Sequence, residues 1–205
     1  MPPDTPPGSP SPRAVRWPSR RSRAGRALAV RLDRATTRSS GRTLLVGNRP
    51  AEPPGASELV RAPADPARLP DGPFDTIVAP LVLAVSPEPR RLLEALAARL
   101  DHVGSLWFVE PTRRPGGAGR FEERLAPWCV RHRGLRPDLD VPAMMRDVGL
   151  TVVDVERFVM RTVIWPLRHT VAGRATIVGY PTGDRVGGDG SYTGRAPGAG
   201  EDHDG

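Results

Sequence analysis

Side chains that could act as catalytic bases or nucleophiles are few and scattered along this 205-residue chain. His102 follows a run of leucines at a predicted helix end, where the helix dipole favours a cation, and His132 stands between two arginines. His169 lies in a predicted closing hairpin, and the single cysteine, Cys129, lies in an apolar stretch typical of packing. None of these residues has a partner at the spacing of a metal site. The sequence therefore identifies no catalytic residue.

Residues that could hold a ligand, by contrast, follow two predicted strands. Gly47 ends an apolar run at residues 43–47, and Leu81 follows a second apolar run at residues 74–80. Near-continuous apolar runs are typical of parallel strands that are covered on both faces. Open α/β sheets bind ligands beyond the carboxyl ends of such strands. The sequence therefore directs attention to the ends of these two strands.

A helix and a strand follow the second run with clear punctuation. Ser86 is a good N-cap, Pro87 suits the first helical position, and Gly104 suits a left-handed C-cap. Four leucines at helical spacing make one apolar face: Leu92, Leu93, Leu96 and Leu100. With a strand at residues 105–109, the segment predicts a right-handed βαβ unit.

The rest of the chain predicts shorter elements around this unit. A strand is expected at residues 58–61 and a turn at residues 65–72. A helix is expected at residues 119–132, with Phe121, Leu125 and Trp128 lining one face. Asp140 and Gly149 punctuate a further short helix. Late strands are expected at residues 151–158, 159–165 and 175–180, and their short connections predict antiparallel pairing at one sheet edge.

Composition separates a central domain from two tails. Residues 1–42 carry ten arginines and two aspartates, and we expect a disordered basic tail with a short helix at residues 23–38. Residues 43–181 are nearly neutral and should form one domain, and residues 182–205 read as a disordered, glycine-rich acidic tail. One cysteine excludes an internal disulfide and favours the cytoplasm. No apolar run approaches the ~20 residues of a membrane helix, so no membrane partner is expected.

Several segments taken together resemble the class I S-adenosylmethionine-dependent methyltransferases, an α/β fold with a Rossmann-like sheet. They are residues 64–70 (ADPARLP), 74–78 (FDTIV), 81–83 (LVL) and 104–111 (GSLWFVEP), followed by the helix–glycine–strand element at 144–153. Residues 165–169 and 173–175 are similar to the family's closing hairpin. The likeness is greatest to the small-molecule branch that includes the methyltransferase-like thiol methyltransferases.

The resemblance implies a cofactor, S-adenosylmethionine, and residues that would bind it. Gly47 corresponds to the start of the family's glycine-rich loop. An aspartate placed like Asp65 hydrogen-bonds the adenine amino group, and the residue after it, here Pro66, offers a backbone N–H to the ring. Ala79, Pro80 and Leu81 would lie near the transferring methyl group. Taken alone, Asp65-Pro66 is somewhat more typical of a plain turn.

The first half of the implied sheet looks incomplete. Residues 48–55 (NRPAEPPG) replace the glycine-rich loop, and prolines there and at Pro66 remove N–H donors. Residues 48–73 are too few for the strands and helices that the family places before Phe74. Three interpretations stay open: a small-molecule methyltransferase that could complete its site with a partner chain, a degenerate non-catalytic module that binds weakly or pairs with an active relative, and an anionic-surface or nucleic-acid binder driven by the arginine-rich tail. A sheet that lacks strands would expose an apolar edge, which favours a homodimer. Nucleic acid is the least favoured partner.

Overall fold

The structure is a computed structural model that describes residues 41–47, 56–114, 116–160 and 168–177. It also describes helical residues in the predicted amino-terminal helix: Arg26, Val30, Arg31, Asp33 and Thr37. The predicted tails at residues 1–22 and 182–205, the loop at residues 48–55 and the predicted strand beyond Met160 lie outside the described residues. The domain limits 43 and 181 therefore stay predictions.

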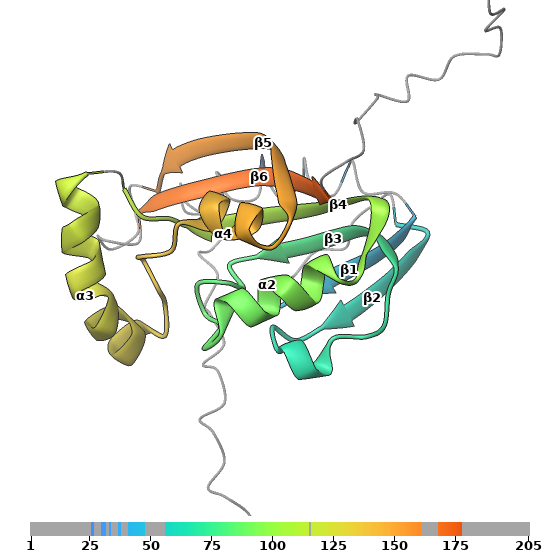
Figure 1. Ribbon diagram of the computed structural model, residues 1–205, viewed down its shortest axis with the longest axis horizontal. Helices are drawn as coiled ribbons and strands as arrows, with labels where there is room; N and C mark the ends of the chain where they lie inside the picture. The colour runs from blue at the N-terminus through green and yellow to red at the C-terminus, as the bar shows by residue number, and fades with distance from the viewer. Residues whose placement is uncertain are drawn as a thin grey trace, which may run out of the picture.

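Six strands form one mixed sheet in the order β2-β1-β3-β4-β6-β5 (Figure 1). β2, β1, β3 and β4 are parallel, and β6 runs antiparallel to both β4 and β5. This confirms the predicted α/β, Rossmann-like, mostly parallel sheet with an antiparallel carboxy-terminal hairpin. The strands are β1 (Arg42–Val46), β2 (Glu58–Ala62), β3 (Phe74–Pro80), β4 (Leu100–Pro111), β5 (Leu150–Val159) and β6 (His169–Ile177).

The amino-terminal edge of the sheet is narrow. β2 pairs directly with β1, from Arg42 opposite Glu58 to Val46 opposite Ala62. Within the described residues only β2 lies outside β1, whereas the resemblance implies two strands there. The chain between Gly47 and Phe74 is too short to supply both strands and their helices.

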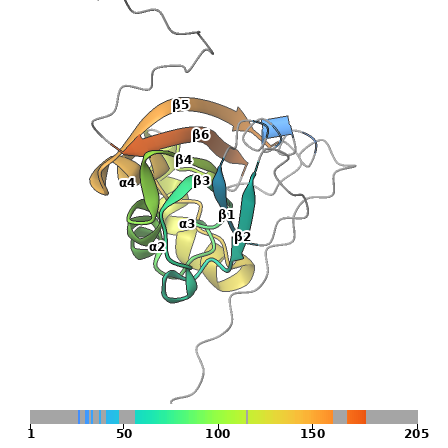
Figure 2. The same ribbon diagram turned by 90° about the vertical axis from the view of Figure 1, so that its right-hand side faces the viewer.

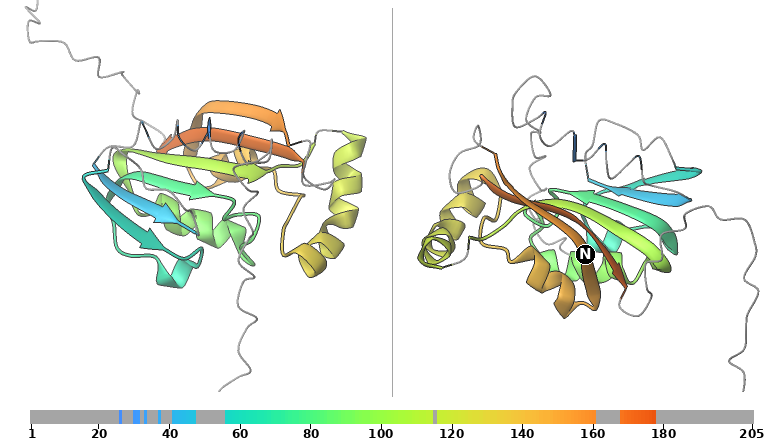
Figure 3. Two further views of the ribbon diagram at one scale, coloured as in Figure 1. Left: turned by 180° about the vertical axis from the view of Figure 1, so that it is seen from behind. Right: turned by 90° about the horizontal axis from the view of Figure 1, so that it is seen from above.

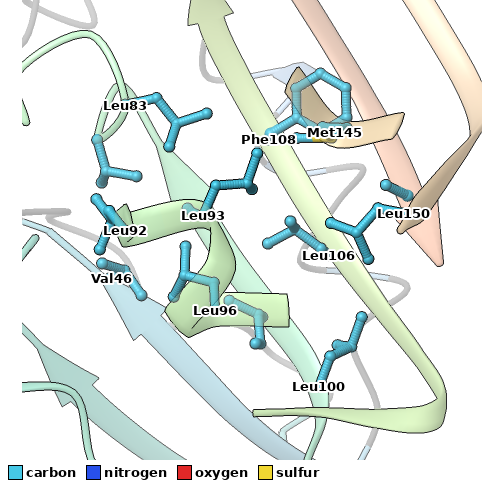
Figure 4. Close-up of a cluster of buried hydrophobic side chains, with 14 of the residues drawn as sticks. Val46, Leu83, Leu92, Leu93, Leu96, Leu100, Leu106, Phe108, Met145 and Leu150 are labelled. Atoms are coloured by element: carbon cyan, nitrogen blue, oxygen red, sulfur yellow. The ribbon is translucent and has the colours of Figure 1, made fainter. Parts of the chain in front are cut away.

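Helices α2 (Pro89–Ala97) and α4 (Val141–Asp147) lie on the same face of the sheet (Figure 2). Leu92, Leu93 and Leu96 of α2 are fully buried against the sheet, as Figure 4 shows. The same cluster contains Val46, Leu83, Leu106, Phe108, Met145 and Leu150. This cluster is the principal core of the domain, and it orients the carboxyl ends of β1, β3 and β4.

The limits predicted for the helix after β3, from Ser86 to Gly104, were wrong at both ends. The Ser86 hydroxyl accepts a hydrogen bond from the Glu88 N–H (3.2 Å), which closes a local turn, and the helix begins only at Pro89. The helix ends at Ala97, and β4 already begins at Leu100. Gly104 lies inside β4 and not at a cap. A Cβ there would lie 2.9 Å from the carbonyl oxygen of Phe74, so glycine allows the close approach of β3.

Helix α3 (Gly117–Arg133) stands beyond the end of the sheet (Figures 1 and 3). Its buried side carries Glu122, Ala126 and Cys129, while Phe121 and Trp128 are 48% and 50% exposed. The predicted helix is therefore confirmed, but its aromatic face is not part of the core. In the described residues, the side of α3 that is most buried is the one that carries Glu122, Ala126 and Cys129.

The carboxy-terminal hairpin differs from its prediction in extent. The strand expected at residues 151–158 is present as β5, but the last strand starts at His169 instead of residue 175. β6 inserts between β4 and β5, so both of its edges are hydrogen-bonded. In the part of the chain that the structure describes, no helix is long and apolar enough to cross a membrane.

Candidate cofactor site

The carboxyl ends of β1, β2 and β3 meet at one edge of the sheet. Val46 pairs with Ala62, and Leu45 pairs with Val78, so Gly47 and Pro80 leave the sheet side by side. The Gly47 N–H donates to the Ala62 carbonyl oxygen (2.9 Å). The structure thus brings the predicted residue Gly47 together with the predicted segment that contains Ala79, Pro80 and Leu81.

Gly47 occupies a position that only glycine fits. Its φ is +85°, in the left-handed region that side chains disfavour. A Cβ at this residue would lie 2.9 Å from Cγ1 of Val82. The bare backbone of Gly47 is therefore available to whatever approaches the edge, while Val82 fills the space on its Cβ side.

Asp65 follows β2 by three residues, and its side chain supports a turn. Its Oδ1 accepts a hydrogen bond from the Ala67 N–H (3.0 Å), which caps the short 3₁₀ helix η1 (Pro66–Arg68). No described residue donates to Oδ2 of Asp65. Pro66 is the first residue of η1, where the missing N–H of proline costs nothing. The turn interpretation of Asp65-Pro66 is thus confirmed, and a role in cofactor binding stays a prediction.

Leu81 has an unusual backbone conformation at the end of β3. Its φ is +55°, the only positive value among the described residues other than glycine. Its N–H donates to the Val109 carbonyl oxygen (2.8 Å), and its side chain is buried with Val109 and Ala172. A non-glycine residue in this region stores strain that the surrounding structure must maintain.

Glu110 is the residue at this edge that the sequence did not single out. Its carboxylate is completely buried at the end of β4. It accepts hydrogen bonds from the N–H groups of Val82 (2.7 Å), Leu83 (2.9 Å) and Ala84 (3.1 Å). Burial raises the pKa of Glu110 to about 8, against the opposing effect of these three donors. Glu110, on the neighbouring strand β4, therefore fixes the segment that follows β3.

A second polar group lies where β4 leads into α3. The Glu122 carboxylate is fully buried and accepts from both the N–H (2.9 Å) and Nε (2.8 Å) of Arg114. His169 starts β6 at the same edge, where its carbonyl oxygen accepts from the Thr112 N–H (2.9 Å). Burial, and then the charge of Arg114, lower the pKa of the His169 imidazole. The described residues contain no group of three side chains that could hold a metal ion.

Solved structures share this fold, although neither sequence comparison finds a match. No protein-family model matches the sequence, and no curated protein matches it. The N-methyltransferase NodS from Bradyrhizobium japonicum WM9, in complex with S-adenosyl-L-homocysteine, is 15% identical with a TM-score of 0.57, over 81% of this chain and 94% of NodS.

Two further structures are similar to the same extent. The [4+2]-cyclase SpnF is 17% identical with a TM-score of 0.56, over 81% of this chain and 87% of SpnF. A Bacillus halodurans C-125 protein assigned as a methyltransferase is 13% identical with a TM-score of 0.56, over 72% of this chain and 97% of that protein. At these identities the likeness establishes the fold. The chain has the fold of the class I S-adenosylmethionine-dependent methyltransferases.

Proposed function

We propose that this protein binds S-adenosylmethionine at the edge formed by Gly47, Asp65 and Leu81 and methylates a small molecule. The observation that carries the proposal is the convergence of a bare left-handed glycine and a strained Leu81 at adjacent strand ends. Strain of this kind is concentrated at ligand clamps and active sites. Membership of the thiol methyltransferase-like branch is part of this proposal and rests on the sequence resemblance.

The residues at the edge fit such a ligand in part. The Gly47 backbone allows the close approach that a carboxypropyl tail needs, and the Oδ2 oxygen of Asp65 can accept a hydrogen bond from an amino or hydroxyl group. Pro66 offers no N–H. When bound, S-adenosylmethionine supplies a methyl group whose bond to sulfur breaks with the electron pair staying on sulfur. The backbone of residues 79–81, just before the segment that Glu110 holds, would border that methyl group.

We assign His169 as the group that takes the acceptor's proton. It lies at the same edge of the sheet, at the end of β4 where Thr112 meets β6. Its lowered pKa keeps the imidazole neutral near pH 7, so a ring nitrogen can accept a proton as the acceptor atom bonds to the methyl carbon. The main contribution to rate would nevertheless come from alignment of the two reactants.

A second function is favoured by a different observation. Within the described residues β2 alone lies outside β1, Pro66 cannot donate, and Val82 fills the space next to Gly47. These features are what a non-catalytic module of the same fold would have, and a fold alone does not determine activity. The similarity to a [4+2]-cyclase makes the same point, because that protein carries the fold with a different reaction.

Binding to the full-length chain separates the two. At a cofactor concentration a hundredfold above the dissociation constant, S-adenosylmethionine should stabilise the native state by ~2.7 kcal/mol. Thermal melts with millimolar S-adenosylmethionine or S-adenosyl-L-homocysteine therefore test the proposal directly. Calorimetric titration then gives the affinity. No shift and no heat with either compound would leave the non-catalytic module.

Asp65→Asn isolates the contribution of the carboxylate. Asparagine keeps an oxygen for the Ala67 N–H, so the turn survives, but the charge is lost. Affinity should fall by roughly tenfold to a hundredfold, the usual worth of a hydrogen bond to a charged group. Asp101→Asn is the matched control, because Asp101 Oδ1 also accepts from a backbone N–H, that of Val103, at 3.0 Å. Asp101 lies at the start of β4, at the opposite edge of the sheet from the proposed cofactor site. Equal affinities for both variants would remove Asp65 from the site.

A further inference from the structure

Two hydrogen-bond donors are buried without an acceptor where β6 begins. Oγ1 of Thr170 and Nε of Arg168 have no hydrogen-bond partner among the described residues. Thr170 is only 1% exposed, so solvent at the surface does not supply the missing acceptor. Buried polar groups are hydrogen-bonded in the great majority of cases, and each exception calls for a physical explanation. Two exceptions this close together indicate a site that an acceptor from outside the chain completes.

The two donors lie on the same face of the sheet. The Arg168 carbonyl oxygen accepts from the Met160 N–H (2.7 Å), which continues the pairing of β5 and β6 by one residue. Side chains two residues apart on a strand point to the same side, so those of Arg168 and Thr170 share a side. Val171 and Ala175 belong to the principal core. The donors are therefore on the face opposite α2 and α4, which the left view of Figure 3 shows from behind Figure 1.

Apolar groups surround Thr170 on this face. Thr170 lies opposite Pro111 on β4 and opposite Phe158 on β5. Phe158 also packs against a small buried apolar cluster at the same end of the sheet. That cluster consists of Leu81, Val109 and Ala172. In such surroundings the local dielectric constant is low, and a hydrogen bond to a charged group is stronger than in water. A ligand for these donors should therefore carry an apolar body beside its acceptor.

The charges near the donors favour an anionic acceptor. Arg168 is permanently cationic and makes no ion pair with a described acid. Arg31 reaches the same face from the amino-terminal helix, with Cζ 3.7 Å from the centre of the Phe158 ring. Arg31 forms an ion pair with Glu156, so the charge of Glu156 is already balanced. The charge of Arg168 has no such balance within the described residues.

We propose that Arg168 and Thr170 bind the carboxylate of a small apolar molecule. A carboxylate has two acceptor oxygens, one for each donor, and its charge balances that of the guanidinium group. The Phe158 ring and the cluster beside it would pack against the apolar body of the ligand. A phosphate group would bring a third strong acceptor oxygen and more negative charge than these two donors satisfy.

This site is separate from the group that takes a proton in the proposed methyl transfer. His169 lies between the two donors in sequence, so its side chain points to the other face of the sheet. The proposal therefore does not rest on methyl transfer or on the binding of S-adenosylmethionine. It can be tested on the full-length chain without a cofactor.

Calorimetric titration with matched probes tests the preference for a carboxylate. The carboxylates are phenylacetate and hexanoate, and their neutral counterparts are phenylacetamide and hexanamide, which have the same apolar bodies. The amides should bind at least ~tenfold more weakly, because a hydrogen bond between two charged groups is stronger than one to a neutral oxygen. Inorganic phosphate should bind more weakly than either carboxylate. The proposal is wrong if neither carboxylate binds at millimolar concentration, or if the amides or phosphate bind as tightly.

Thr170→Val distinguishes a ligand site from a structural hydrogen bond. Valine keeps the shape of the side chain and removes the hydroxyl. Since an unpaired buried group is lost, the Tm of the ligand-free protein should rise by about 2–4 °C, while the affinity for phenylacetate falls by about tenfold. A fall in Tm would mean that a buried water or an internal partner already satisfies the hydroxyl, and would overturn the proposal.

Thr112→Val is the matched control for this measurement. The Thr112 hydroxyl is also buried, but it donates to the Leu139 carbonyl oxygen (3.1 Å). Its removal leaves that carbonyl oxygen without this donor, so the Tm should fall and the affinity for phenylacetate should not change. A loss of affinity in Thr112→Val as large as that in Thr170→Val would contradict the proposed position of the site.

Arg168→Gln tests the charge at the site. The affinity for phenylacetate should fall by about tenfold to a hundredfold, whereas that for phenylacetamide should change little. Arg174→Gln is the control, because Arg174 lies on the same strand and face but over the Trp107 ring, with Cζ 5.8 Å from the ring centre. Circular dichroism verifies that each variant is folded. Equal losses in the two variants would mean that the general positive charge of the chain attracts these anions, and would overturn the proposal.

Discussion

The two halves of the sheet differ in length and in how they are held. β1 and β2 have five residues each, whereas β4, β5 and β6 have 12, 10 and 9. In the long half, β6 is hydrogen-bonded on both sides and α4 packs against β5. In the short half, β2 is an edge strand that ends in a turn capped by a half-exposed aspartate. The proposed donor site lies on the short half.

The short half therefore depends on the long one for its geometry. Glu110, from β4, supplies the acceptors for three consecutive N–H groups beyond β3. Val82, one of those three residues, is also the neighbour of Gly47, the residue that follows β1. Accordingly, the position of the proposed cofactor edge should respond more to a change on β4 than to a change on β2.

Glu110→Ala should give the largest loss. It leaves three buried N–H groups without an acceptor, each costing about 1–3 kcal/mol, so the free energy of unfolding should fall by roughly 5 kcal/mol. Urea denaturation followed by circular dichroism measures the change. Glu110→Gln keeps one acceptor oxygen and should lie between this variant and wild type. A loss below about 1 kcal/mol for Glu110→Ala would show that the short half does not depend on Glu110 for its stability.

Stability should fall as the pH rises from about 4.5 through about 8. The pKa of Glu110 is raised to about 8 in the folded state, so the native protein holds a proton that the unfolded chain releases near pH 4.5. The carboxyl group's contribution is complete below pH 4.5 and is lost through pH 8, a change on the order of 5 kcal/mol. Unfolding titrations between pH 4 and 9 measure it.

The same titration on Glu110→Gln provides the control. His169 acts in the opposite direction, because its lowered pKa makes the native state bind fewer protons near pH 6, so its contribution rises with pH. Glu110→Gln should remove the downward slope and leave only the weak upward one. If the slope of wild type persists in Glu110→Gln, another group is its source.

Gly47→Ala and Gly134→Ala compare the short half of the sheet with the end of helix α3 at the level of the backbone. Both glycines have positive φ, +85° and +65°, so both substitutions introduce left-handed strain of about 1 kcal/mol. Only at Gly47 does a Cβ also meet a neighbour, Cγ1 of Val82 at 2.9 Å, whereas nothing lies within 4 Å at Gly134. Gly47→Ala should therefore cost about 2–3 kcal/mol in all.

The double variant Gly47→Ala/Val82→Ala isolates the steric part. Removing the valine methyl groups should recover part of the cost of Gly47→Ala, so the two changes should be non-additive in urea denaturation. Additive losses of unfolding free energy would mean that the backbone at Gly47 moves away from Val82 at no cost, and that packing does not fix this edge.

The strands were predictable because their signal is local. Residues 43–47 and 74–80 are near-continuous apolar runs, and such runs are typical of buried parallel strands. The start of α2 was less predictable, since Ser86 uses its hydroxyl for a turn before the helix and does not cap it. For α3 the sequence showed which side is aromatic, but not that Phe121 and Trp128 stay about half exposed.

Glu110 could not have been assigned from sequence. A carboxylate at the end of a strand is visible, but its partners are backbone N–H groups 26 to 28 residues earlier, and backbone donors carry no sequence signal. The strain at Leu81 is hidden for the same reason, because leucine does not predict a positive φ. Gly47, by contrast, was recognised because glycine after a strand is itself a signal for unusual backbone.

The smallest expected effect is a difference in unfolding free energy between substitutions at two capping aspartates, Asp140 at α4 and Asp65 at η1. Asp140 Oδ1 accepts from the Ala143 N–H (3.2 Å) at the start of α4, a helix that buries Val141, Pro142 and Met145 in the core. Asp65 caps only the three residues of η1, none of them buried. Asp140→Ala should cost about 1 kcal/mol, the usual worth of an N-cap, and Asp65→Ala about half of that or less. Urea denaturation of the two variants measures the difference. A larger loss for Asp65→Ala would mean that the turn after β2 holds the proposed cofactor edge in place, and that the short half is less dependent on Glu110 than the sheet geometry implies.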